Sequence, residues 1–288
     1  MDIESKKFLG QPKNFVSIFN ALLFDGQPVL KPEYLKDENS ELVMNVSSKH
    51  VDIIKRYEDG TYLDLFVIES QSYVDQCMVA RVMEYESVAR MRYIRQNFKK
   101  HVPMHTRLPM ILTVVLYVGE SKWNAAKRLS ELEIIHPGFE DMFNEFKLNL
   151  IELNTNHKYN TGEKATQDFF DLLRMIYRKQ ILKEDLDREF NRDALYFAYV
   201  VTKNKELLNI YQESEKGDVK VCRALDEMFE ESTNKGIQMG IKQGIEQGSE
   251  KKELEMYQKM MDKGFGITAI ASIFSVSEES IKKLLMKA

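Results

Sequence analysis

The chain has 288 residues, of which 43% are hydrophobic and 30% are charged, and its formal net charge at pH 7 is −4. The length allows one large domain with an appendage, and the slight acidity argues against a protein that coats DNA regardless of sequence. No segment has the length and apolarity of a membrane span and no signal peptide is evident, so we expect a cytoplasmic protein without a membrane partner. Cys77 and Cys222 are expected to be buried thiols.

The N-terminal region contains one helix-like and one strand-like segment. Residues 15–24 are apolar and are followed by Gly26 and Pro28, which predicts a short helix. Residues 31–40 are charged, and we expect a loop that leads into a short helix. Residues 42–46 predict a first strand.

The next segment has the pattern of a β-hairpin. Two β-rich runs, 51–57 and 61–71, flank the pair Asp59-Gly60, which is a strong signal for a tight turn. The second run is apolar as far as Ile68, which is typical of a central strand that is covered on both faces.

Polar side chains would meet at the end of this hairpin. Side chains alternate along a strand, so Glu69 and Gln71 point to the same face. If the turn is tight, with Glu58 opposite Thr61, Asp52 is a diagonal neighbour of Glu69 at roughly 7–8 Å. A turn with one more residue would move Asp52 to the other face. Two carboxylates and an amide in this arrangement can hold a hard divalent ion, yet spacing alone favours three polar groups where a strand meets solvent.

Residues 74–98 predict a long helix with two distinct faces. The apolar face consists of Met78, Val82, Tyr85, Ala89 and Tyr93. A basic face, the densest basic region of the chain, contains Arg92, Arg95 and Lys99, with Arg81 close to it. A solvated surface and a phosphate-binding face beside the strand end are equally good interpretations.

The remainder of the first half predicts a mixed sheet, and the second half predicts helices. Residues 110–118 and 148–153 are strand-like, with a helix-like segment at 138–147 between them. Trp123 is expected to pack on the core. After residue 160 we expect no further strands. Three helical patterns follow, at residues 163–179, 183–212 and 219–233.

Glycine recurs every fourth residue near the C-terminus, at Gly236, Gly240, Gly244 and Gly248. Each glycine weakens a solvated helix by roughly 1 kcal/mol. The segment is therefore either a flexible linker or a close-packed helix pair in a homo-oligomer, and we favour a weakly stable helix. Residues 267–274 and 278–286 then predict two short helices around a turn, with Ser277 as a cap. This small helix-turn-helix-like tail contains few basic residues, so protein contact is at least as well supported as DNA contact.

Several of these segments resemble one family. Asp52, the hairpin and the Glu69-x-Gln71 strand end resemble the PD-(D/E)XK nuclease superfamily, and most closely its transposase-associated Rpn/YhgA-like branch of recombination-promoting nucleases. Residues 20–33, residues 108–120 with Trp123, and the glycine repeat are also similar to segments of that branch. These segments are distributed along most of the chain, so the resemblance covers most of it.

The resemblance implies a DNA endonuclease that depends on Mg²⁺ or Mn²⁺. Asp52 and Glu69 would be the metal ligands and, with Gln71, the catalytic residues. The candidates for contacts with DNA phosphates would be Arg81, Arg92, Arg95 and Lys99. Gln71 stands where the superfamily has lysine, and an amide can orient water but carries no charge to stabilise the transition state. The alternative is therefore a catalytically inactive nuclease-fold oligomer that binds DNA or protein.

We accordingly predict an α/β fold class, with a restriction-endonuclease-like mixed sheet flanked by helices, a helical subdomain and a C-terminal helical tail. The expected divisions are a nuclease-like core at 1–158, a helical subdomain at 159–234, and a glycine-repeat helix or linker with the small tail at 235–288.

Overall fold

The computed structural model describes residues 3–38, 53–60, 63–98, 100–181, 183–214 and 217–286. The chain forms two compact units, Met1–Asp226 and Glu227–Ala288. The predicted division of the first unit at residue 158 remains a prediction.

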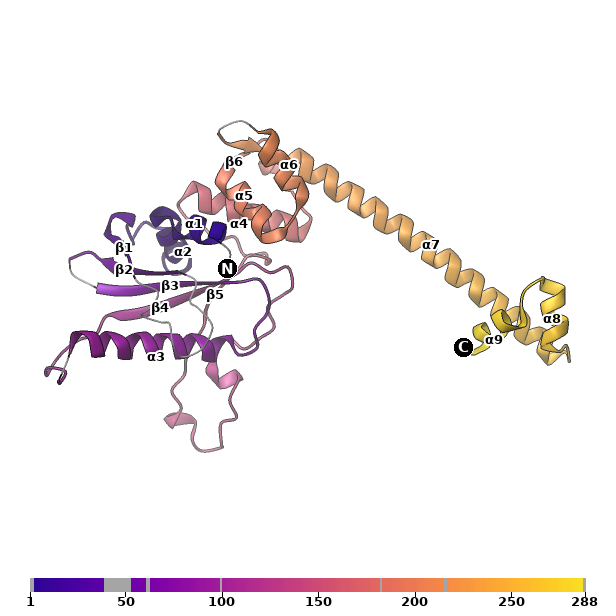
Figure 1. Ribbon diagram of the computed structural model, residues 1–288, viewed down its shortest axis with the longest axis horizontal. Helices are drawn as coiled ribbons and strands as arrows, with labels where there is room; N and C mark the ends of the chain where they lie inside the picture. The colour runs from indigo at the N-terminus through magenta and orange to yellow at the C-terminus, as the bar shows by residue number, and fades with distance from the viewer. Residues whose placement is uncertain are drawn as a thin grey trace. The chain divides into compact units, whose positions relative to one another are not determined.

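A five-stranded mixed sheet forms the centre of the first unit (Figure 1). In order across the sheet, its strands are β1 (Leu35–Asp37), β2 (Ile53–Glu58), β3 (Leu63–Gln71), β4 (Met110–Tyr117) and β5 (Asn149–Glu152). The first two pairings are antiparallel, and the pairings of β3 with β4 and of β4 with β5 are parallel. The carboxyl ends of β3, β4 and β5 therefore meet at one edge of the sheet, where Gln71, Tyr117 and Glu152 are in register. We call this the C-terminal edge.

Helices cover both faces of the sheet, which confirms the predicted α/β architecture (Figure 1). On one face, Leu65 and Val67 of β3 pack with Tyr85 of α3 (Met78–Asn97). On the other face, the ring of Phe66 stacks on that of Phe19 in α2 (Pro12–Phe24), with centroids 4.8 Å apart. The apolar run of β3 thus forms a central strand buried on both sides, as its sequence predicts.

The turn between β2 and β3 is longer than predicted. Glu58 pairs with Leu63 and Ile54 pairs with Val67, so the predicted pairing of Glu58 with Thr61 is wrong. The register is shifted by two residues, and a shift of two keeps each side chain on its expected face. Gly60 has a φ of +90°, a conformation that favours glycine, so the Asp-Gly pair does mark the turn.

The helical part of the first unit packs around aromatic side chains. Its helices are α1 (Ile3–Gly10), α4 (Lys164–Arg178), α5 (Arg192–Thr202), α6 (Lys205–Glu213) and the start of α7 (Cys222–Asp262). Phe8 of α1 contacts Phe169 of α4 and Phe197 of α5, with ring centroids 5.7 and 4.7 Å away. Through these contacts α1 packs in a layer whose other helices lie far from it in the sequence.

Three secondary-structure predictions for this unit are wrong. Within residues 31–40 the predicted short helix is present as the 3₁₀ helix Pro32–Tyr34, but strand β1 follows it where no strand was predicted. Two strands do follow residue 160, namely β6 (Glu189–Phe190) and β7 (Val219–Lys220), which pair with each other. β6 interrupts the predicted helix at 183–212, and β7 takes the first two residues of the predicted helix at 219–233. The predicted strand at 42–46 lies outside the described residues.

The third error concerns residues 138–147, which form a single 3₁₀ turn, Glu140–Met142, instead of a helix. The backbone around Phe146 is engaged elsewhere, because Leu129 N donates to Phe146 O and Leu148 N donates to Lys127 O. Two further 3₁₀ turns are Leu129–Glu131 and Lys183–Asp185. Tertiary hydrogen bonds thus override a weak local helical preference.

The second unit contains most of α7 together with α8 (Ile267–Phe274) and α9 (Glu278–Met286). Tyr257, Ile270 and Ile281 form its core. The hydroxyl of Ser277 accepts a hydrogen bond from Ser280 N at 3.1 Å, which confirms the predicted cap.

The glycine repeat lies within α7, a continuous helix of 41 residues, so the helical interpretation is confirmed over the flexible linker. Apart from the adjoining backbone of the same helix, a methyl group added at any of the four glycines would meet no atom of the described chain within 4 Å. Ile241 beside them is 58% exposed. Pairing of this helix in a homo-oligomer remains a prediction.

The two cysteines differ in their exposure. Cys222 is buried as expected, whereas Cys77 is exposed at the start of α3, and both are free thiols. Throughout the described ranges, no helix combines the length and the apolarity needed to cross a membrane.

Candidate active site

Glu69 and Gln71 lie at the end of β3, on the face that α3 covers. Each is only 4% exposed. The amide nitrogen of Gln71 lies 3.6 Å from the sulfur of Met78, in the first turn of α3. The two polar residues of the Glu-x-Gln pattern are therefore buried between the strand and the helix that follows it.

Arg81 joins Glu69 to two further polar groups. Its Nη2 lies 3.2 Å from Glu69 Oε1 and donates to the hydroxyl of Tyr85 at 2.8 Å, while Nη1 pairs with Asp75. Burial by itself would lower the pKa of the Arg81 guanidinium. The hydrogen bonds of Asp75 and Tyr85 and the charge of Glu69 outweigh burial and raise that pKa. A permanent positive charge thus lies beside the carboxylate of Glu69.

The predicted basic face does not gather at one point of α3. Arg81 is in the first turn, and its side chain is 16% exposed. Arg92 and Arg95 lie in the second half of the helix, with Arg95 exposed, and eleven residues correspond to about 16 Å of helix. Asp52 and Lys99 lie outside the described residues, so the predicted proximity of Asp52 to Glu69 remains a prediction.

Sequence reasoning missed the roles of Asp75 and Tyr85. Asp75 lies between β3 and α3, where it accepts a hydrogen bond from Cys77 N at 2.9 Å as well as pairing with Arg81. Tyr85 counts as apolar in the helix pattern, although its spacing of four residues from Arg81 is a signal for contact. No comparable spacing signal exists for Asp75, because it precedes the helix.

The described side chains supply part of a magnesium-binding set. The carboxylate of Glu69 and the amide oxygen of Gln71 are hard oxygen donors of the kind that Mg²⁺ prefers. Arg81, however, already bonds to Glu69. Across the described parts of the chain, no group of three or more His, Cys, Asp or Glu side chains is arranged to hold a metal ion. The donors have suitable chemistry, and further ligands are needed to complete a site.

Close backbone contacts hold the C-terminal edge together. Val118 N donates to Gln71 O at 2.8 Å, directly after β4. A methyl group at Gly119 would lie 2.6 Å from Ser72 O and 2.5 Å from the hydroxyl of Tyr117, both far too close. Glycine is therefore required at position 119 because the backbone passes close to the chain that follows β3.

Trp123 completes this packing, as its sequence context predicts. Its ring meets that of Tyr117 edge to face, with centroids 5.1 Å apart, and its indole nitrogen donates to Ala125 O at 3.0 Å. The tryptophan is thus a buried structural residue.

Glu86 is a second buried carboxyl on the same helix. It is 7% exposed and accepts a hydrogen bond from Thr113 N of β4 at 3.0 Å. Burial raises the pKa of Glu86, against the opposing effects of the Thr113 hydrogen bonds and the charge of Arg90. The charged form of this side chain is therefore the unfavourable one.

We expect Glu86→Gln to stabilise the protein at pH 8 and to have little effect at pH 4. Because the folded pKa of Glu86 is raised above 4.5, its contribution to stability is fully present below that pH and is lost as the pH rises through the folded pKa. Glutamine keeps an acceptor for Thr113 N without the charge. Urea unfolding midpoints at the two pH values measure this, with Glu84→Gln as the charge-matched control on a partly exposed position. A midpoint gain of equal size at both pH values would contradict it.

Comparison with known proteins identifies a family for the chain. The family model described as "Putative transposase, YhgA-like" matches residues 33–207. No curated protein and no solved structure matches the chain. The matched span covers more than half of the chain and includes the whole five-stranded sheet, Glu69, Gln71 and Arg81. The chain therefore belongs to the YhgA-like transposase family.

Proposed function

We propose that the protein is a magnesium-dependent DNA endonuclease that hydrolyses phosphodiester bonds at the C-terminal edge of its sheet. The observation that carries the proposal is the buried end of β3, where the carboxylate of Glu69 bonds to the guanidinium of Arg81 and the amide of Gln71 lies on the same strand face. Membership in a transposase family supports DNA as the substrate. Mn²⁺ is the expected substitute for Mg²⁺, because its ligand preference is similar.

Asp52 and Glu69 are the proposed metal ligands. Asp52 directly precedes Ile53, which pairs with Ile68, and Ile68 directly precedes Glu69. If this pairing continues by one residue, the two acids are opposite each other, which is closer than the diagonal arrangement that a tight turn predicts. When bound, Mg²⁺ supplies a Lewis acid for the phosphoryl oxygen and lowers the pKa of a bound water.

Arg81 supplies the positive charge that Gln71 lacks. A lysine at position 71 would present an ammonium at the strand end, whereas the amide of Gln71 can only orient water. The guanidinium of Arg81 lies 3.2 Å from Glu69 in the same buried space. It is placed to stabilise the negative charge that develops on the phosphoryl oxygens during hydrolysis.

Plasmid cleavage in the presence of Mg²⁺ tests the proposal directly. We expect Asp52→Asn and Glu69→Gln each to lower the cleavage rate by at least about 100-fold, because each removes a charged metal ligand. Asp64→Asn is the matched control: it removes an acid from the other end of β3, where Asp64 accepts a hydrogen bond from Met110 N. If the Asp52 and Glu69 variants cut DNA as fast as the parent, the proposed site is wrong.

A second candidate function is a nuclease-fold protein that binds DNA or protein without cleaving it. The pairing of Arg81 with Glu69 favours it, because a guanidinium already satisfies one oxygen of that carboxylate. Calorimetric titration with Mg²⁺ separates the two functions. The endonuclease predicts a binding heat that Glu69→Gln abolishes, whereas the binding protein predicts no heat that depends on Glu69.

A further inference from the structure

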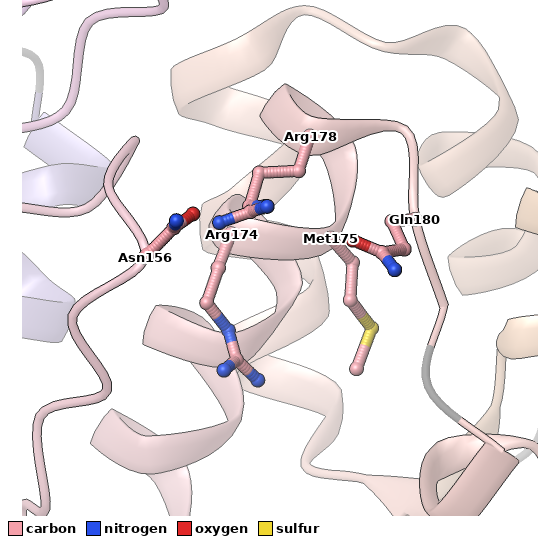
Figure 2. A pocket seen from close by; sticks show the side chains of 5 residues that line it. All are labelled: Asn156, Arg174, Met175, Arg178 and Gln180. Atoms are coloured by element: carbon pink, nitrogen blue, oxygen red, sulfur yellow. The ribbon is translucent and has the colours of Figure 1, made fainter.

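A polar pocket of about 180 Å³ lies between the last turns of α4 and the segment that follows β5. The residues that line it are Asn156, Arg174, Met175, Arg178 and Gln180. The head groups of Asn156 and Arg178 point toward each other, and Arg174 extends from the preceding turn of the helix (Figure 2). Met175 and Gln180 close the opposite side (Figure 2).

The polar side chains of this pocket are rich in hydrogen-bond donors. Two guanidinium groups and two amides line it, and no carboxylate does. Arg174 Nη2 donates to Asp171 Oδ1 at 3.1 Å, but Asp171 is shared with Arg188, so the positive charge of Arg174 is only partly offset. Among the described residues, the side chains of Arg178, Asn156 and Gln180 make no hydrogen bond or ion pair. Unused donors around an open pocket fit a small oxyanion.

Two arginines lie near the end of α4, and their guanidinium groups extend in different directions, that of Arg178 toward Asn156 (Figure 2). Arg174 and Arg178 are four residues apart and therefore lie on one face of the helix. A helix C-terminus by itself disfavours an anion, with roughly half a negative charge. Here Lys179 adopts the left-handed conformation, and the amides of Lys179 and Gln180 bond to the carbonyls of Ile176 and Met175. The charge of Arg178, together with the part of the Arg174 charge that Asp171 leaves uncompensated, thus outweighs a dipole whose terminal carbonyls are partly satisfied.

We infer that this pocket binds a phosphate group, and, resting on the proposed function, that the phosphate is a phosphodiester of the DNA strand held at the C-terminal edge. Arginine forks match the geometry of phosphate oxygens, and the neighbouring amides add neutral donors. The proposal extends the DNA contact beyond the residues of α3 to a different layer of the protein.

The location of the pocket supports DNA as the source of the phosphate. Asn156 comes four residues after Glu152, which is in register with Tyr117 and, through it, with Gln71. Tyr177, which lies between Arg174 and Arg178 in the sequence, donates its hydroxyl hydrogen to Val118 O. The backbone nitrogen of the same Val118 donates to Gln71 O. β5 lies two strand spacings from β3, about 10 Å, which is similar to the roughly 12 Å width of a DNA major groove. A duplex that crosses the C-terminal edge can therefore reach both the end of β3 and the pocket beyond β5.

Fluorescence anisotropy with a labelled DNA duplex, without divalent cations, tests the DNA contact in the full chain. Arg178→Gln should weaken binding to every duplex sequence alike and should reduce the slope of log affinity against log salt by about 0.9, the value for one phosphate. Lys179→Gln is the matched control, because it removes the same charge from the next residue, which does not line the pocket. Circular dichroism confirms folding. An unchanged slope for Arg178→Gln would overturn the DNA assignment.

Calorimetric titration with inorganic phosphate tests the pocket itself. We expect one binding heat that Arg178→Gln removes and Lys179→Gln retains, and equal heats in both variants would overturn phosphate binding. Arg178→Gln could remove the heat of phosphate binding and yet leave the salt dependence of DNA binding unchanged. In that case the pocket holds free phosphate and the DNA assignment is wrong. If the DNA slope depends on Arg178 although Asp52→Asn and Glu69→Gln still cleave, the phosphate pocket is supported and the proposed catalytic residues are not.

Discussion

Arg81→Gln is expected to slow the proposed DNA cleavage by about 10²–10³-fold, because it removes a cation that contacts Glu69 in the proposed site. The same change should lower the free energy of unfolding by about 3–5 kcal/mol, since the carboxylate of Glu69, which is 5% exposed, loses its ion pair with the Arg81 guanidinium. Single-turnover cleavage with saturating protein, measured well below the unfolding midpoint, isolates the first effect. Urea unfolding of the same preparation measures the second.

Two further variants separate the charge of Arg81 from its shape. Arg81→Lys keeps a positive charge but cannot contact Glu69, Asp75 and Tyr85 together, so we expect an intermediate cleavage rate. Arg128→Gln removes an exposed arginine from outside the site and should match the parent in both measurements. A folded Arg81→Gln protein that cleaves at the parent rate would remove Arg81 from the proposed mechanism.

Local patterns were sufficient to predict a mixed sheet and the approximate positions of β2, β3, β4 and β5 along the chain. Long apolar runs such as 110–118 have few alternatives in a globular chain, and the Asp-Gly pair marks a reversal of direction. The register was not predictable from that pair, because a two-residue and a four-residue turn can both contain it. Glu58 pairs with Leu63 instead of Thr61. Because this shift is two residues, each side chain still lies on the predicted face of the sheet.

The candidate site was predictable as far as its strand and no further. Alternation along β3 places Glu69 and Gln71 on one side, but it does not show which helix covers that side. Arg81 looked like part of a basic surface with Arg92 and Arg95, because helical periodicity describes angles around an axis and not contacts with other elements. Its pairing with Asp75 and Glu69 depends on how the loop after β3 turns back, and short sequence motifs do not encode that path.

The buried ion pairs of the helical layer could not be predicted from the sequence either. Asp168, Asp171 and Asp185 are charged residues in a polar-looking stretch, yet their side chains are at most 5% exposed. Burial on this scale requires partners, and the partner common to all three is Arg188. Nothing in the spacing of these four residues distinguishes such a network from a solvated surface.

We expect Arg188→Leu to lower the free energy of unfolding by about 3–5 kcal/mol, a large part of the 5–15 kcal/mol that holds a typical domain folded. Arg188 lies 2.7 Å from Asp171 Oδ2 and 3.3 Å from Asp185 Oδ1, and it also pairs with Asp168. Asp168 would retain Lys164, and Asp171 would retain Arg174. Among the described residues, Asp185 has no other cation, so its charge would remain buried without compensation.

A double-mutant cycle in urea identifies that uncompensated charge as the cause. Asp185→Asn should cost little in the Arg188→Leu background, or even restore stability, because it removes the charge that the first change leaves unpaired. Lys183→Gln, which removes an exposed charge two residues from Asp185, should leave the unfolding midpoint close to that of the parent. Because α4 carries Asp168 and Asp171 as well as Tyr177 and Arg178, the same loss should also loosen the phosphate pocket. If the losses from Arg188→Leu and Asp185→Asn simply add, the two residues are not coupled, and the instability has another origin.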